Sequence, residues 1–251
     1  MEKIIENAIK LDQFVLFYQP ILDIKLKKIS HYECLLRIEL ANKEIIMPGD
    51  FITQAEQIGI IDQIDRLVLK KAIEQHLAFQ KIGNNARLAI NLSGRSMNDE
   101  SILPYIEKLL HQEHVKPELI IFEITETSAV SNFLSAKSMI KKLKALGCKF
   151  ALDDFGVGFS SFYYLKSLPV DYVKIDGSFM KQMDTSEEDR IFVKVLTEVS
   201  QTFGKKIIAE FVENKTILGL LEQQGVDYAQ GYYVSKPIRD PLDLGHVKGL
   251  E

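Results

Sequence analysis

Short apolar runs alternate along the chain with stretches of helical spacing. Eight runs have the length and composition of strands; they cover residues 14–20, 31–38, 87–93, 119–125, 149–154, 171–176, 205–211 and 227–234. Between most of them apolar residues recur every three to four positions, as in 61–79, 136–147, 190–204 and 215–225, which predicts amphipathic helices. This order predicts parallel βαβ units.

The number of runs favours a closed barrel. Gly147, Gly204 and Gly225 each stand between a helical stretch and a strand, where we expect left-handed helix caps. Roughly eight strands in 251 residues predict an α/β fold of the (β/α)8 TIM-like barrel type. The alternative is a doubly wound open sheet, but no Gly-rich dinucleotide loop follows an early strand.

Composition and charge narrow the class of protein. The net charge of −4 gives no indication of a nucleic-acid polymer as partner. No apolar run reaches the ~20 residues of a membrane span, and the N-terminus lacks a signal-peptide core. The two cysteines, Cys34 and Cys148, make no disulfide framework or metal motif. We therefore expect a reduced, cytoplasmic protein without a membrane segment.

Polar residues gather where the predicted strands end. They are Glu33, Asn91, Glu123, Asp153, Asp154, Lys174, Asp176, Glu210 and Gln230. In a barrel the carboxyl ends of the strands meet at one mouth, where catalytic residues lie. A single polar residue at such a position carries little information, but the repetition over most of the strands predicts a site.

The predicted site has more carboxylates than positive side chains, so its negative charge must be neutralised. Two carboxylates 4 Å apart repel by about 4 kcal/mol at an effective dielectric constant of 20. Only Lys174 offers a positive charge, so the cluster must protonate or bind metal. Its oxygen ligands suit Mg²⁺ or Mn²⁺ better than zinc. Asp153 and Asp154 leave the backbone in different directions and can serve two neighbouring metals, an arrangement used for in-line attack on a phosphodiester.

The motifs resemble those of the EAL domain family, whose members are cyclic-di-GMP phosphodiesterases. The naming motif is "ECLLR" at residues 33–37, with Cys34 in place of the usual alanine. In order along the chain stand "YQP", "PGDFI", "NLS", "EITET", "DDFGVGFSS", "VKIDGSF", "IAEFVE" and "QGYYVSKP". The resemblance implies one EAL domain over 1–251, with the motifs in 14–237. Residues 1–13 would be an N-terminal helix or linker remnant, and 238–251 a C-terminal segment.

The resemblance also implies roles for individual residues. Metal ligands would be Glu33, Asn91, Glu123, Asp153 and Asp154, holding two Mg²⁺ or Mn²⁺ ions. Lys174, Glu210 and Asp154 would be catalytic, with Lys174 and Glu210 beside the attacking water. Substrate contacts would come from Gln19, Leu35, Arg37, Glu213 and Gln230. Glu126, Asp176, Gly156, Gly158 and Ser160 would support the site and its loop.

The implied reaction is hydrolysis of cyclic-di-GMP to linear pGpG by two-metal in-line attack of an activated water. Family members pair near the "DFG" loop, so we expect a homodimer, and the resemblance leaves open a regulatory domain or protein outside this chain. Val157, Phe159 and Phe211 depart from the family pattern, and Phe211 stands where the family has glycine. They keep open a catalytically weak or silent receptor for the same dinucleotide. A weaker alternative is an unrelated metal-using barrel enzyme acting on a sugar phosphate.

Overall fold

The barrel begins with a β-hairpin. In the computed structural model, which describes residues 1–157 and 162–242, strand β1 (Phe14–Asp23) pairs antiparallel with β2 (Lys28–Glu39). The four residues between them are too few for a crossover helix, since a parallel connection needs about a dozen. The predicted strand–helix alternation therefore starts only after β2. The hairpin register places Gln19 directly opposite Glu33.

The described strands close into the predicted TIM-like barrel. Around it the order is β1-β9-β8-β7-β6-β5-β4-β2, and β2 pairs back to β1, while the short β3 (Ile45–Ile46) extends β2 outside the ring. The remaining strands are β4 (Arg87–Asn91), β5 (Ile120–Thr125), β6 (Lys149–Phe155), β7 (Tyr172–Ile175), β8 (Lys206–Ala209) and β9 (Tyr228–Ala229). From β2 to β9 the ring neighbours are parallel.

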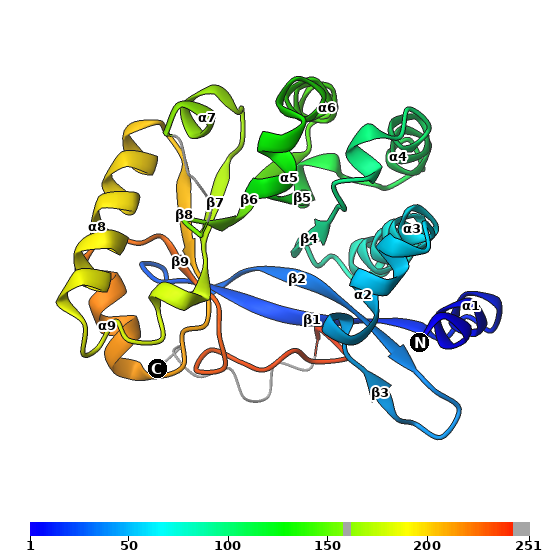
Figure 1. The fold of residues 1–251 in the computed structure, drawn as a ribbon, viewed down its shortest axis with the longest axis horizontal. Coiled ribbons are helices and arrows are strands. Elements are labelled where there is room, and N and C mark those ends of the chain that lie inside the picture. The colour runs from blue at the N-terminus through cyan, green and yellow to red at the C-terminus, as the bar shows by residue number, and fades with distance from the viewer. Residues whose placement is uncertain (158–161, 243–251) are drawn as a thin grey trace.

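Helices surround the strands (Figure 1). They are α1 (Glu2–Lys10), α2 (Pro48–Gln57), α3 (Ile61–Lys81), α4 (Ile102–Leu110), α5 (Glu126–Ser131), α6 (Phe133–Ala145), α7 (Phe162–Ser167), α8 (Glu187–Thr202) and α9 (Lys215–Gln223), with short 3₁₀ turns at Ser96–Asn98, Pro117–Leu119 and Gly177–Phe179. The positive φ values of Gly147, Gly204 and Gly225 confirm the predicted left-handed caps. Helices α3, α6, α8 and α9 contain the predicted helical segments almost entirely.

Two layers of side chains fill the barrel. The lower layer is a separate apolar cluster of Ile21, Ala89, Ile121, Ala151, Tyr172 and Ile208. Two positions further along β4, β5, β6 and β7 stand Asn91, Glu123, Asp153 and Lys174, and Glu210 directly follows β8. Because residues two apart share one face of a strand, these polar side chains lie above an apolar floor. The strand period thus brings polar groups from five chain segments to one end of the barrel.

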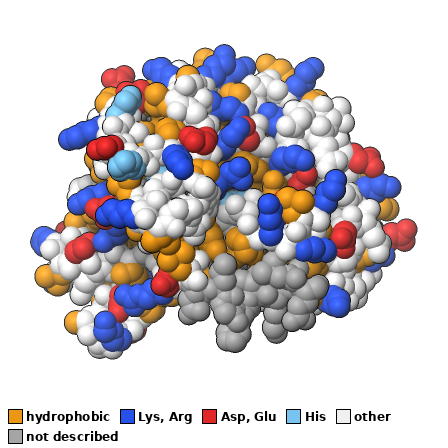
Figure 2. All heavy atoms as spheres, turned by 180° about the vertical axis from the view of Figure 1, so that it is seen from behind, with side chains coloured by type: hydrophobic (Ala, Val, Ile, Leu, Met, Phe, Trp, Pro, Cys, Tyr) orange, Lys and Arg blue, Asp and Glu red, His pale blue; other side chains and the backbone are white. Residues whose placement is uncertain are grey.

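The face of the molecule behind the view of Figure 1 carries side chains of mixed character. On the face turned away from the viewer in Figure 1, Lys and Arg side chains are interspersed with Asp and Glu and with smaller hydrophobic areas (Figure 2). Among the described residues, none of the helices combines the length and hydrophobicity of a membrane span.

Candidate active site

Lys174 lies at the centre of the predicted cluster. Its side chain is 1% exposed. Its Nζ lies 2.9 Å from Glu210, 3.0 Å from Glu123, 3.1 Å from Asp153 and 3.3 Å from Glu33. The four carboxylates outweigh the effect of burial, which alone would lower the pKa, and raise the pKa of Lys174 well above its usual value. The ammonium therefore stays charged and offsets part of the surrounding negative charge.

Glu33 is held by amides as well as by Lys174. Asn91 Nδ2 donates to Glu33 Oε1 at 2.9 Å, and Gln230 Nε2 donates to Glu33 Oε2 at 2.6 Å. Gln230 Nε2 also lies 3.1 Å from Gln19 Oε1. Burial acts to raise the pKa of Glu33, but Lys174 and these hydrogen bonds outweigh it and lower the pKa. Glu33 is therefore the ionised, fully oriented member of the cluster.

Glu123 and Glu210 lack sufficient positive charge nearby. Burial, with repulsion from Glu33 and Asp153, raises the pKa of Glu123 well above its usual value. Burial likewise raises the pKa of Glu210 to about 8. Glu123 Oε1 is buried and has no hydrogen-bond partner among the described residues. A buried, unpartnered carboxylate oxygen in an all-oxygen cluster fits a hard divalent cation, which would supply both the charge and the missing contact.

The paired aspartates sit on a bulge in β6. The register between β6 and β7 shifts by one residue between Leu152 and Phe155. Asp154 adopts a left-handed backbone with φ of 55°, a conformation that Asp tolerates better than most residues. One oxygen each of Asp153, Asp154 and Glu210 lie within 4.8 Å of one another. The bulge therefore turns Asp154 away from the ammonium and gives the mouth a second carboxylate grouping.

Three of the predicted supporting residues, Glu126, Gly156 and Asp176, make hydrogen bonds within the described part of the chain. Glu126 Oε2 accepts a hydrogen bond from Gly156 N at 3.2 Å, which ties α5 to the start of the "DFG" loop. Asp176 Oδ1 accepts from Ser178 N and begins the 3₁₀ turn after β7. Gly158, Phe159 and Ser160 lie outside the described residues, so the predictions for them stay predictions.

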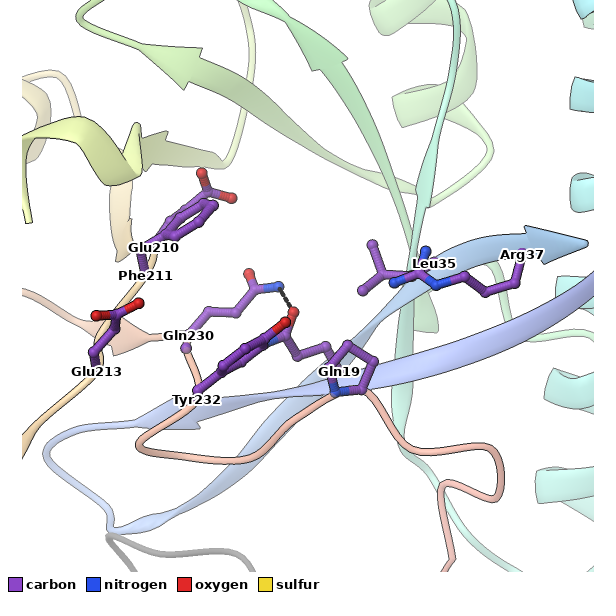
Figure 3. A pocket seen from close by; sticks show the side chains of 10 residues that line it. Gln19, Leu35, Arg37, Glu210, Phe211, Glu213, Gln230 and Tyr232 are labelled. Atoms are coloured by element: carbon purple, nitrogen blue, oxygen red, sulfur yellow. Dashed lines mark hydrogen bonds between the residues drawn. The ribbon is translucent and has the colours of Figure 1, made fainter. Parts of the chain in front are cut away.

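A pocket opens beside the carboxylates. Its volume is about 200 Å³, and all five predicted substrate-binding residues line it: Gln19, Leu35, Arg37, Glu213 and Gln230. Glu210, Phe211, Gly231, Tyr232 and Pro237 complete the lining. Figure 3 shows Glu210, Phe211 and Glu213 at one end, Leu35 and Arg37 at the other, and Gln19, Gln230 and Tyr232 between them. The pocket therefore combines apolar walls with amide, carboxylate and guanidinium groups.

The sequence motifs did not predict a role for Asp65 of α3. This buried carboxylate has three hydrogen-bond donors: Ser93 N at 3.2 Å, and the Ser93 and Ser96 hydroxyls at 2.6 Å each. It thereby fixes the loop that directly follows Asn91. A clue was present in the sequence, because Asp65 occupies a position of the apolar stripe formed by Ile61, Ile64, Val68 and Leu69.

The chain belongs to the EAL domain family, whose model matches residues 2–237. It is similar to solved structures over nearly its whole length. One is described as the PaMucR phosphodiesterase in complex with c-di-GMP, with a TM-score of 0.91, 29% identity and coverage of 96% of this chain and 98% of that one. Another is the FimX EAL domain from Pseudomonas aeruginosa bound to c-di-GMP, with a TM-score of 0.88, 31% identity and coverage of 95% and 96%.

Among curated proteins, cyclic di-GMP phosphodiesterase PdeB of Shewanella oneidensis is 39% identical over 93% of this chain and 27% of its own length. PdeA of Borreliella burgdorferi, also named a cyclic di-GMP phosphodiesterase, is 34% identical over 92% of this chain and 34% of its own. The chain therefore spans about a third of the length of these relatives.

Proposed function

We propose that this chain is a phosphodiesterase that hydrolyses cyclic-di-GMP to linear pGpG with two bound divalent cations, Mg²⁺ or Mn²⁺. The observation that carries the proposal is the buried cluster of carboxylates around Lys174, with Glu123 Oε1 unpartnered, beside a pocket suited to a nucleotide. Relatives named as cyclic di-GMP phosphodiesterases and neighbours solved with c-di-GMP support the substrate.

The proposed metal ligands are Glu33, Asn91, Glu123 and Asp153 for one cation, and Asp153 with Asp154 for the other. Asn91 uses its Nδ2 on Glu33, which leaves its Oδ1 as the ligand atom. When bound, the two cations would reverse the negative potential of the mouth and make bound water more acidic. A phosphodiester, itself an anion, could then enter the mouth.

The chain's own groups would position the substrate and move a proton. Arg37 Nη1 donates to Leu36 O at 2.7 Å, and the remaining N–H groups of the guanidinium would donate to a phosphate, while Gln19, Leu35, Glu213 and Gln230 would hold the rest of the dinucleotide. Burial raises the pKa of Glu210 to about 8 in the metal-free protein, and the positive charge of bound cations would lower it again, which would leave the carboxylate ready to accept a proton from water. Lys174, 2.9 Å from Glu210, would stabilise the charge that this carboxylate carries.

Assembly and location are further parts of the proposal. A homodimer through the surface beside α6 and α7 is supported by exposed Leu134, Phe162 and Tyr163. Two free, buried cysteines suit a reducing compartment such as the cytoplasm. Because the relatives are longer, a regulatory domain or protein acting on this domain is also part of the proposal.

Incubating the purified chain with cyclic-di-GMP and Mn²⁺ or Mg²⁺ tests the function. We expect linear pGpG, with at least about a 100-fold loss of rate in Glu33→Ala, since that carboxylate orients both Asn91 and Lys174. Glu198→Ala, on the exposed side of α8, is the matched control and should keep the wild-type rate. Tight binding without turnover would favour the receptor alternative, and an absence of both binding and turnover would refute the substrate.

A further inference from the structure

Phe211 has an unusual backbone for a large aromatic residue. Its φ is 51°, in the left-handed region where a Cβ crowds the backbone and which glycine adopts most readily. Its side chain remains 53% exposed. A strained residue that gains little burial does not stabilise the fold, and such residues concentrate at functional sites.

The surrounding chain holds this strained backbone in place. Glu210 N donates to Ile175 O at 3.3 Å, and Val212 N donates to Gln230 O at 2.9 Å, so both neighbours of Phe211 are anchored. Tyr233 N donates to Val212 O at 2.9 Å. Gly231 allows the two loops to touch, because a Cβ there would overlap the backbone of Val212.

The direction of the ring is fixed as well. Any Cβ at residue 177 would overlap the Phe211 side chain, so the ring rests on the backbone of Gly177. Phe211 is also one of the residues that line the pocket, together with Glu210, Glu213 and Gln230. Figure 3 shows Phe211 at the end of the pocket where Glu210 and Glu213 lie. The exposed apolar surface thus faces the ligand space.

We propose that Phe211 is the base-stacking residue of this pocket. The free part of its ring packs on one purine of the ligand, and the nearby polar groups of Glu213 and Gln230 meet the edge of that base. The identity of the ligand rests on the proposed function. Stacking is the interaction that an exposed aromatic ring offers to a nucleobase, and it tolerates different bases. Phe211 therefore sets the affinity for the nucleotide, while the carboxylate cluster sets the chemistry.

The test distinguishes the effect of base stacking on affinity from the effect of backbone strain at Phe211 and from hydrolysis of the ligand. Binding of cyclic-di-GMP is measured by calorimetry with Ca²⁺ in place of Mg²⁺ or Mn²⁺, so that the carboxylates stay neutralised, and chromatography verifies that the ligand stays intact. The variants are Phe211→Tyr, which keeps the ring; Phe211→Leu, which keeps apolar bulk; and Phe211→Asn, which removes the ring but tolerates a positive φ. Ile82→Asn, an exposed apolar residue outside the pocket, is the control.

We expect Phe211→Tyr to bind within about twofold of wild type, and Phe211→Leu and Phe211→Asn to bind about tenfold more weakly, as for loss of one base–aromatic stack. The melting temperature of Phe211→Asn should equal or exceed that of wild type, since the strain is relieved while affinity falls. If Phe211 only supported the fold, Phe211→Asn would lower the affinity for cyclic-di-GMP and the melting temperature together.

Wild-type affinity in Phe211→Leu and Phe211→Asn would overturn the stacking role, as would a parallel loss of affinity and melting temperature in Phe211→Asn. Binding that depends on Phe211 in a protein that never cleaves cyclic-di-GMP with Mn²⁺ would support stacking and overturn only the catalytic function. A wild-type protein that binds neither cyclic-di-GMP nor GMP would overturn both proposals.

Discussion

At the scale of single residues, Lys174 decides the electrostatics of the site. It is the only cation that contacts the carboxylate cluster within the described residues, and it pairs with residues as distant in the sequence as Glu33. Removing one partner from a buried ion cluster leaves uncompensated charge, which is more costly than the net contribution of the intact pairs. The same carboxylates are the proposed metal ligands, so Lys174 and any bound cations would together neutralise them.

Lys174→Met should therefore destabilise the metal-free protein by about 3–5 kcal/mol at pH 8. Without the ammonium, the folded state would hold extra protons on the cluster at pH values where the unfolded chain has released them. The free energy of unfolding of Lys174→Met then falls as the pH rises from about 5 to 8, because its native state binds more protons than its unfolded state.

Urea unfolding in EDTA at pH 5, 6.5 and 8 measures the effect, with Lys194→Met on exposed α8 as the control. A destabilisation that is equal at all three pH values would contradict this explanation and point to lost packing.

At the scale of elements, α3 controls the loop after β4. Asp65 on the buried face of α3 accepts all three donors from the segment that contains Ser93 and Ser96, so the helix and the end of the strand are tied together. Burial raises the pKa of Asp65, although the hydrogen bonds from Ser93 and Ser96 act in the opposite direction. This contact connects a helix outside the barrel with Asn91 at its mouth.

Asp65→Ala should cost about 2–4 kcal/mol of stability, because it leaves buried hydroxyl and amide donors without a partner. It should also weaken Mn²⁺ binding about 10-fold or more, as expected when the support of a ligand is lost. Calorimetric titration with Mn²⁺, together with urea unfolding, tests both effects. Asp62→Ala, on the same helix and without these contacts, is the control. Unchanged Mn²⁺ affinity in a destabilised Asp65→Ala would show that the contact supports the fold alone.

At the scale of the whole molecule, several exposed apolar side chains come from α6, α7 and the residues just before α7 in the sequence. Leu134 of α6 is 79% exposed and Tyr163 of α7 is 65% exposed, and Val157 and Phe162 are exposed nearby in the sequence. The ring of Phe133 lies 5.2 Å from that of Tyr164 and 6.5 Å from that of Tyr163, so α6 and α7 join in one aromatic group.

If the homodimer forms through this area, Leu134→Asp should convert it to a monomer at micromolar concentration, since a charge there would be desolvated on association. Light scattering after gel filtration measures the mass, and a melting temperature near that of wild type shows that the fold is intact. Leu26→Asp, at the exposed turn of the first hairpin, should leave the dimer unchanged. A wild-type protein that is monomeric at all concentrations would refute the dimer.

Much of the architecture could be predicted from the sequence because its signals are local. The periods of 2 and 3.6 residues depend on neighbours a few positions apart, and they located the parallel strands and the main helices. The polar residues at strand ends identified the mouth, because every parallel strand of a barrel points the same way. The antiparallel hairpin of β1 and β2 departs from the predicted strand–helix alternation, because the connection between these two strands is too short for a helix.

The amino-acid sequence by itself determined the barrel, the chemistry of the carboxylate cluster and the family. Only the tertiary structure decided which groups meet: Lys174 with four carboxylates, Asp65 with the loop after β4, and the Phe211 ring with Gly177. It also decided the positive φ values of Asp154 and Phe211. The physical reason is that these contacts join segments far apart in the chain, and a strained backbone persists only where such contacts hold it.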